Sequence, residues 1–175
     1  MALVCPDCGA ENIDGVDTCE SCGQSLTMLN KPQRSPSPVG DGMLRDQIKV
    51  LQPKQPVTTS PEMPLEDALQ IMLENKIGSI LITQDEKLVG IFSERDAVNR
   101  VGIEFETLRR QPISDFMTPL PGTLEAGNKI IFAVHKMAIG GYRHVPIVEG
   151  DRPVGVISIR DILRYVEEQI GGPSS

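Results

Sequence analysis

The first 26 residues contain all four cysteines of the chain, arranged as two Cys-x-x-Cys pairs. The first pair is Cys5 and Cys8, and ten residues separate it from the second pair, Cys19 and Cys22. A glycine follows each pair and allows a tight turn in which backbone N–H groups point at the thiolates. Four thiolates at this spacing are a typical ligand set for tetrahedral Zn²⁺. The sequence therefore predicts a structural zinc site.

Two other kinds of chemistry use paired cysteines, namely disulfides and redox-active pairs. Disulfides are disfavoured because the N-terminus lacks the basic head and the long apolar core of a secretion signal, which predicts a cytoplasmic chain. A redox pair would not need a matched second copy. Zinc is therefore the favoured interpretation, and residues 1–28 resemble a small zinc ribbon whose metal supplies most of its folding free energy.

The charge of the chain restricts its partners. Residues 1–30 contain five acidic side chains and no Lys or Arg, and the whole chain carries a net charge of −7. Nucleic acid and anionic membranes both attract basic surfaces, so both are disfavoured, whereas a small nucleotide needs only a few local cations. No apolar run of about 20 residues predicts a membrane span. The ribbon is expected to meet a protein partner, and residues 29–42, rich in Pro, Ser and Gly, are predicted to be a flexible linker that tethers it loosely.

A heptapeptide that occurs twice is the second candidate for chemistry. Gly90–Asp96 reads Gly-Ile-Phe-Ser-Glu-Arg-Asp, and Gly155–Asp161 reads Gly-Val-Ile-Ser-Ile-Arg-Asp, 65 residues later. Each copy ends in Ser-x-x-Asp, where a strand is expected to meet a helix. A hydroxyl and a carboxylate in this arrangement suit the vicinal diol of a ribose. The same pattern is a helix capping box, which stabilises a helix by about 1 kcal/mol without any ligand, and both roles can coexist. The four residues are Ser93, Asp96, Ser158 and Asp161.

The same offset relates longer segments, roughly residues 57–101 and 122–166, so the chain is built from two copies of one unit. In each copy an apolar stripe at i, i+3, i+4 and i+7 predicts a helix, beginning at Leu65 or Ile130. Two short apolar strands and a second helix follow, which gives strand–helix–strand–strand–helix and a fold of the α/β class (α+β type). We predict repeats over 43–111 and 112–170, followed by a tail over 171–175. The expected strands are Ser79–Thr83, Leu88–Phe92, His144–Val148 and Pro153–Ile157, and the expected second helices are Glu94–Val101 and Ile159–Gln169.

At the repeated heptapeptide the chain resembles the cystathionine-β-synthase (CBS) domain family over roughly residues 47–169. The most specific element is the pattern Gly-h-h-Ser-x-x-Asp, where h is apolar, and it is complete in both copies. Phe116–Pro119 (Phe-Met-Thr-Pro) is also similar to the lead-in of a family member. The resemblance implies a tandem CBS pair, or Bateman module, with a pseudo-two-fold axis, and it implies a homodimer.

The resemblance further implies an adenosine-containing ligand, such as AMP, ADP, ATP or S-adenosylmethionine, bound between the repeats. Gly78-Ser79 stands where the second copy has Arg143-His144, with only Lys76 as compensation, so we expect tighter binding beside Ser158 and Asp161. His144 can equally be a packed strand residue. One implied cleft uses Thr58, Ile77, Gly78 and Ser79 for the base, Ser158 and Asp161 for the ribose, and Arg143 and His144 for phosphate; the other uses Thr123, Tyr142, Ser93 and Asp96.

No catalytic constellation is evident, because the chain has no P-loop and no cysteine outside the four predicted zinc ligands. The sequence therefore predicts a non-catalytic regulatory protein that senses an adenosine-containing ligand and signals to a partner. Two alternatives remain open at this point. One is a nucleic-acid-associated or transcription-related regulator that uses the ribbon, and the other is a scaffold with empty clefts.

Overall fold

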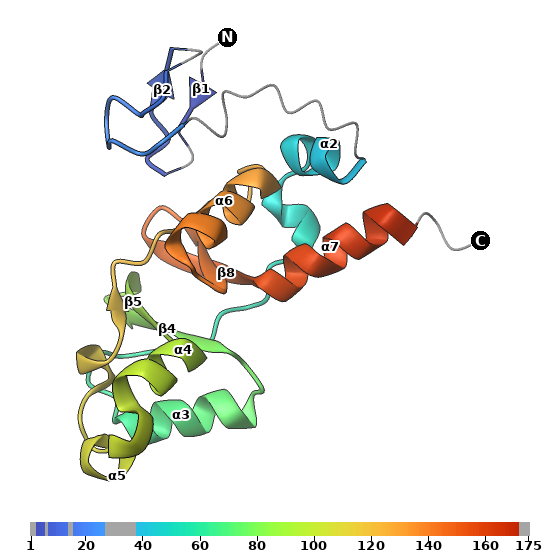
Figure 1. The fold of residues 1–175 in the computed structure, drawn as a ribbon. Coiled ribbons are helices and arrows are strands. Elements are labelled where there is room, and N and C mark those ends of the chain that lie inside the picture. Colours follow the sequence, from blue (N-terminus) through green and yellow to red (C-terminus); the bar gives the residue numbers. More distant parts are fainter. Residues whose placement is uncertain (1–2, 6, 14–15, 27–37, 172–175) are drawn as a thin grey trace.

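The computed structural model describes residues 3–5, 7–13, 16–26 and 38–171. Figure 1 shows three parts in a row: the ribbon at the top, the second repeat in the middle and the first repeat at the bottom. The ribbon therefore neighbours the repeat that is more distant in the sequence. Among the described residues, no helix is long and apolar enough to cross a membrane.

The ribbon is a small body built around its cysteines. Strands β1 (Leu3–Val4) and β2 (Glu11–Asn12) pair antiparallel. Its interior consists of Cys5, Cys19 and Leu26, all nearly inaccessible to solvent. A core this small cannot hold a fold without a cross-link or a metal.

The first repeat has the predicted order of elements, whereas in the second the described residues form no entry strand and Leu124 makes only an isolated parallel bridge to Ile147. The long strands of both repeats form the expected antiparallel pairs β4–β5 and β7–β8. Each pair has a register shift at the same repeat position, after Ile82 and after Ile147. The first repeat contains β3 (Thr58–Thr59), α3 (Leu65–Glu74), β4 (Ser79–Gln84), β5 (Lys87–Ser93), α4 (Glu94–Asp96), the π-helical turn η2 (Ala97–Val101), η3 (Gly102–Glu104) and α5 (Phe105–Leu108). After η4 (Ile113–Asp115) and β6 (Thr118–Pro119), the second repeat contains α6 (Ile130–Gly140), β7 (His144–Glu149), β8 (Arg152–Ser158) and α7 (Ile159–Gly171).

The end of the predicted linker is helical. Helix α2 (Pro38–Arg45) contains residues 38–42, which the proline and glycine content assigned to an extended segment; residues 29–37 lie outside the described residues. A side chain at Gly42 would overlap the ring and hydroxyl of Tyr165 on α7. The prediction was wrong for residues 38–42 because tertiary packing against α7 outweighs the low helix propensity of this segment.

The two repeats complete each other's cores. Ile48 and Leu51, from the short helix η1 (Ile48–Leu51) ahead of the first repeat, are buried in the core of the second. Ile113 and Phe116, ahead of the second repeat, are buried in the core of the first. Side chains from within each predicted repeat, 43–111 and 112–170, are therefore buried in the core of the other. The two repeats fold as one unit, because the core of each repeat is completed by residues from the lead-in of the other repeat.

Two glycines make this exchange possible. A side chain at Gly90 would overlap the sulfur of Met117, and a Cβ at Gly155 would lie 2.7 Å from the Cβ of Pro53. Both partners belong to the crossing lead-ins, which pair with β5 and β8 beside these glycines. The repeated glycine of the heptapeptide thus makes room for the neighbouring chain segment.

Gly155→Ala is expected to destabilise the fold by about 1–3 kcal/mol, because the proline ring of Pro53 cannot move aside from the added methyl group. Gly127→Ala is the matched control, since a Cβ there meets no atom within 4 Å. Urea denaturation followed by circular dichroism measures both. Equal free energies of unfolding for the two variants would show that the contact at Gly155 is not tight.

A hydrogen bond joins α7 to the segment that precedes η1. The buried Tyr165 hydroxyl donates to Asp46 Oδ2 at 2.8 Å. Burial, and then the bond to Asp46, raise the pKa of Tyr165 to about 12. The same bond is the main cause of a lowered pKa at the Asp46 carboxyl.

The stability contributed by neutral Tyr165 is expected to be complete below pH 10, the usual tyrosine pKa, and to be lost between about pH 10 and pH 12. Tyr165→Phe should reduce this alkaline loss, because no phenol then ionises in the core. Denaturation at increasing pH measures this loss of stability, with Tyr142→Phe as the control at the other tyrosine of the chain. The same alkaline decline in both variants would contradict the assignment.

Candidate ligand cavities and metal centre

A cavity of about 400 Å³ lies between the two repeats at the start of α7; we call it the Ser158/Asp161 cavity. The sequence predicted eight residues for this cleft, and seven of them line the cavity. Its walls therefore come from both repeats, as a ligand that bridges them requires. The seven are Ile77, Gly78, Ser79, Arg143, His144, Ser158 and Asp161.

At the base of this cavity Asp161 caps α7. Its Oδ2 accepts the Ser158 backbone N–H and the Ser158 hydroxyl, both at 2.7 Å. Its Oδ1 accepts one bond from Arg164, at 3.0 Å. A carboxylate offers about four acceptor positions, so Oδ1 keeps one for a further donor. Capping and ligand contact are thus compatible at Asp161.

A second cavity, of about 350 Å³, lies at the start of α4; we call it the Ser93/Asp96 cavity. Ser93 donates its N–H and hydroxyl to Asp96 Oδ2 at 2.9 and 2.6 Å. The other oxygen, Oδ1, accepts Thr118 at 3.2 Å and pairs with Arg100 at 3.5 Å. Asp96 therefore accepts three hydrogen bonds within the protein, as Asp161 does, and in addition pairs with Arg100.

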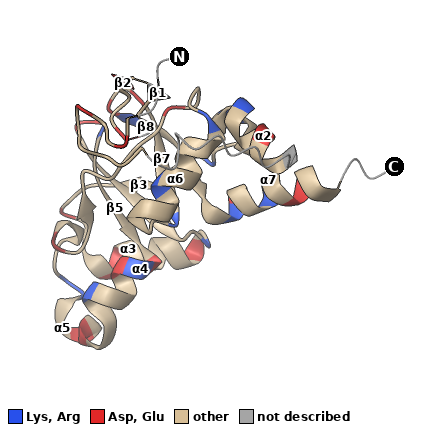
Figure 2. Ribbon diagram, turned by 45° about the horizontal axis from the view of Figure 1, so that its top comes forward, with Lys and Arg blue, Asp and Glu red and all other residues tan. Residues whose placement is uncertain are grey.

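The basic side chains of the two cavities differ in what they already bind. Four cations line the Ser158/Asp161 cavity, and within the described part of the chain their side chains make no hydrogen bond or ion pair. In the Ser93/Asp96 cavity, Arg95 donates to the Gly141 carbonyl at 2.7 Å and Arg100 to those of Phe116 and Met117. Figure 2 shows basic and acidic positions interspersed on α4 and α7. The four cations are Lys54, Lys76, Arg143 and Arg160.

Two parts of the predicted charge asymmetry were wrong. Lys76, expected to compensate the first-repeat cleft, lines the Ser158/Asp161 cavity. Arg143 and His144 line both cavities, because β7 begins at the wall between them. The sequence offset of 65 residues assigned each residue to a single cleft, but a residue in a wall shared by two cavities lines both of them.

His144 is held tightly at this wall. Its Nδ1 is buried without a hydrogen-bond partner, and its ring lies against Gly78, where a Cβ would be 2.7 Å from Cε1. Burial lowers the pKa of His144, and Arg160 and Arg143 lower it further against the opposing effect of Glu94 and Asp161. The side chain is therefore a packed neutral imidazole near pH 7, which makes Arg143 the better phosphate ligand of the pair.

The two predicted threonines are displaced from the cavities by one residue. Val57 and Gly122 line the cavities in place of Thr58 and Thr123. Successive residues of an extended segment face opposite sides, so an error of one position selects the wrong side. The prediction also missed Lys54 and Arg160. Arg160 could have been found from the repeated heptapeptide, because both copies read Ser-x-Arg-Asp at this point.

The four cysteine sulfurs form one cluster, with every pair within 4.8 Å. Cys5 and Cys22 are 3.7 Å apart, and Cys8 and Cys19 are 3.6 Å apart, far beyond a disulfide bond. Sulfurs bound to Zn²⁺ at about 2.3 Å in a tetrahedron lie about 3.8 Å from each other. The cluster therefore fits a tetrahedral thiolate site for zinc.

The turns around the cysteines have the geometry that the glycines predicted. Gly9 and Gly23 both have φ +74°, and each N–H donates to the carbonyl of Cys5 or Cys19. Burial raises the pKa of the Cys19 thiol, but backbone N–H groups of Cys22 and Ser21 outweigh it and the pKa falls to about 6. Such N–H donation favours the thiolate form that binds a metal.

The ribbon is docked on the second repeat, which corrects the expectation of a loose tether. Asp7, between Cys5 and Cys8, forms an ion pair with Lys136 of α6 at 3.1 Å. Gln24 of the ribbon and His135 of α6 line one small cavity, and Figure 1 shows the ribbon above this helix. The acidic charge of the ribbon thus meets a basic side chain of its own chain.

A protein-family model described as the CBS domain matches residues 50–102 and residues 113–168. The chain belongs to the CBS-domain family. Each match contains one complete Gly-h-h-Ser-x-x-Asp pattern, which confirms the resemblance seen in the repeated heptapeptide. The zinc ribbon precedes both CBS matches.

Solved CBS structures have the same fold. The CBS-domain containing protein ATU1752 from Agrobacterium tumefaciens is 29% identical with a TM-score of 0.63, covering 68% of this chain and 98% of that one. The CBS domain pair of MJ0100, in complex with 5′-methylthioadenosine and S-adenosyl-L-methionine, is 24% identical (TM-score 0.61, 69% and 95% covered). CBSX2 in complex with AMP is 19% identical (TM-score 0.60, 72% and 98% covered). These two likenesses show the shared fold.

Among curated proteins, the CBS domain-containing mitochondrial protein CBSX3 of Arabidopsis thaliana is 25% identical over 105 residues. The match covers 57% of this chain and 51% of CBSX3. For CBSCBSPB1, also from Arabidopsis thaliana, it covers 24% of the relative. The chain therefore spans about half or less of the length of these relatives.

Cys8→Ser is expected to abolish stoichiometric zinc binding, because three thiolates leave the tetrahedral site incomplete. Metal analysis of the purified protein measures the change, with Ser21→Ala as a control inside the second Cys-x-x-Cys pair. The thermal unfolding of the CBS repeats should change little, since the cores of the repeats contain no ribbon residue. Equal zinc content in Cys8→Ser and the wild type would rule out this site.

Proposed function

We propose that this chain is a non-catalytic regulatory protein that binds an adenosine-containing ligand, mainly in the Ser158/Asp161 cavity, and signals its presence to a protein partner. The cavity takes its walls from both repeats, so a bound ligand contacts both at once. Such a ligand favours one relative packing of the repeats over another, which is the physical requirement for a sensor. A homodimer is part of this proposal.

The observation that carries the proposal is the set of four cations around the Ser158/Asp161 cavity that have no hydrogen-bond or ion-pair partner among the described residues. Arg and Lys side chains without protein partners are ready to form charge-assisted hydrogen bonds to phosphate oxygens. The free acceptor position of Asp161 adds a site for a ribose hydroxyl. Phosphate and ribose contacts thus come together at one cavity, which suits a ligand such as the AMP held by CBSX2; the ligands of MJ0100 share the ribose but carry no phosphate.

The backbone at Lys76 supports a binding role for its side chain. Lys76 follows α3 with φ +52°, in the left-handed region where a side chain is disfavoured. The equivalent residue after α6 is Gly141, with φ +63°, the usual residue at this position of a helix end. A lysine kept at a strained position beside the cavity indicates a function for its ammonium group.

Lys76→Gly is therefore expected to move stability and binding in opposite directions. Relief of the strained φ should leave the melting temperature equal or higher. The loss of a phosphate contact worth about 1.5 kcal/mol should weaken ADP and ATP binding roughly tenfold. Isothermal titration of the zinc-loaded protein with AMP, ADP, ATP and S-adenosylmethionine measures the affinities, and calorimetric melting measures the stability.

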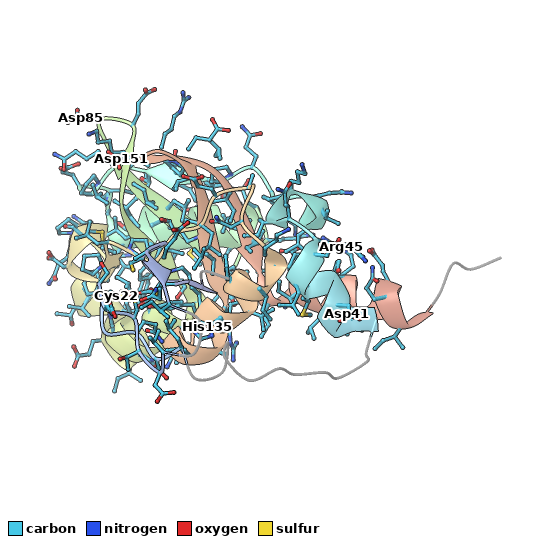
Figure 3. All side chains as sticks on the ribbon, turned by 90° about the horizontal axis from the view of Figure 1, so that it is seen from above. Cys22, Asp41, Arg45, Asp85, His135 and Asp151 are labelled. Carbon is cyan, nitrogen blue, oxygen red and sulfur yellow. The ribbon has the colours of Figure 1, made fainter. Side chains whose placement is uncertain are left out.

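Asp85→Gly is the matched control, because Asp85 also has positive φ (+49°) but lies at a hairpin tip, far from α7 in Figure 3. It should leave every affinity unchanged. Arg160→Gln should weaken nucleotide binding more than Arg95→Gln, which changes the equivalent residue of the other cavity. Equal losses would contradict the asymmetry. A folded wild type that binds none of the four ligands would contradict the sensor and leave both Ser-x-x-Asp motifs as helix caps.

A further inference from the structure

The contact between the ribbon and α6 depends on a buried charge. Lys136 is 6% exposed, and its ammonium pairs with Asp7 Oδ1 at 3.1 Å. A buried ammonium without an anionic partner is strongly unfavourable, so Lys136 needs Asp7 in order to stay under the ribbon. Asp7 lies between two predicted zinc ligands, Cys5 and Cys8. A zinc ion bound by these cysteines would therefore hold the loop that presents the carboxylate.

The same lysine lies directly behind the wall of the Ser93/Asp96 cavity. Its Nζ is 3.3 Å from where a Cβ would stand at Gly122, and Gly122 lines that cavity. A smaller cavity of about 220 Å³ lies between the ribbon and α6. Gly140 and Tyr142 line both cavities, so one short segment separates the ribbon from the ligand space.

Three parts of the molecule hold this segment, residues 140–143. From the first repeat, Arg95 donates to the Gly141 carbonyl at 2.7 Å. From the second repeat, the Ile159 N–H donates to the Arg143 carbonyl at 2.9 Å. From the ribbon side, the Asp7–Lys136 pair fixes the last turns of α6. A displacement of any one of the three parts changes the cavity wall.

We propose that the docking of the zinc ribbon on α6 around Lys136 and the occupancy of the Ser93/Asp96 cavity favour each other. The linkage rests on the proposed adenosine-sensing function. Ligand and docked ribbon stabilise the same conformation of residues 140–143 from opposite sides, and such a coupling is reciprocal. Zinc is required because it orders the loop that carries Asp7. The ribbon is thereby the element of this chain that reports the ligand.

The docking is tested without ligand by hydrogen exchange of the full-length, zinc-loaded protein. Asp7→Asn should accelerate exchange several-fold in α6 and in residues 140–143, because the neutral amide no longer compensates Lys136. Glu20→Gln is the control, since Glu20 occupies the second Cys-x-x-Cys loop and forms no ion pair in the described chain. Metal analysis verifies that both variants keep zinc. Unchanged exchange in Asp7→Asn would overturn the docking contact.

The linkage is tested by AMP titration of the same variants. Asp7→Asn should weaken the Ser93/Asp96 site several-fold and the Ser158/Asp161 site less, because only Arg143 of residues 140–143 also lines the latter cavity. Saturating AMP should slow exchange of α6 in the wild type. If Asp7→Asn accelerates exchange but alters neither affinity, docking is correct and the linkage is wrong. If the wild type binds no AMP, ADP, ATP or S-adenosylmethionine, the sensing function and the linkage both fail. In that case the hydrogen-exchange comparison of Asp7→Asn with the wild type still tests the docking contact.

Discussion

The structure depends on one packing constraint, the exchange of lead-in segments between the two repeats. Each repeat buries two apolar residues that precede the other repeat, Ile48 and Leu51 in one core and Ile113 and Phe116 in the other. The removal of these side chains from water is the dominant favourable term in joining the repeats. Because the lead-ins cross, the repeats cannot separate without opening both cores. The cavities between them are therefore held by the same interactions that stabilise the fold.

Pseudo-symmetry makes two cavities, and the differences between the repeats make them unequal. The protein already uses Arg95 and Arg100 to bind carbonyl oxygens, which leaves fewer guanidinium donors for a ligand beside Asp96. Around Asp161 the four lining cations have no hydrogen-bond or ion-pair partner among the described residues, although Glu94 and Asp161 line the same cavity. The distinction lies in whether the donor groups of each cation are already used by the protein. A ligand with phosphate groups is sensitive to exactly this difference.

The zinc ribbon adds a third part whose position is set by electrostatics more than by apolar burial. Its own core contains Leu26 and two of the cysteines, so its shape depends on the metal. Its contact with α6 includes the ion pair between the buried Lys136 and the half-exposed Asp7, which fixes the position of the ribbon because the buried ammonium is unfavourable without an anionic partner. Metal binding, docking and the cavity wall at Tyr142 are thereby connected through a few neighbouring side chains.

The sequence by itself determined the repeat, the helix–strand–strand–helix order within it, the candidate zinc ligands and the Ser-x-x-Asp pairs, because periodicity and close spacing are local properties. Cys5 to Cys22 and the two heptapeptides are such local signals. Only the tertiary structure decided which lead-in completes which core, that Val57 and Gly122 line the cavities, and that Asp7 meets Lys136. These features arise between segments that are distant in the chain, where burial and charge pairing depend on the complete fold. The local sequence pattern does not identify which distant residue each side chain will contact.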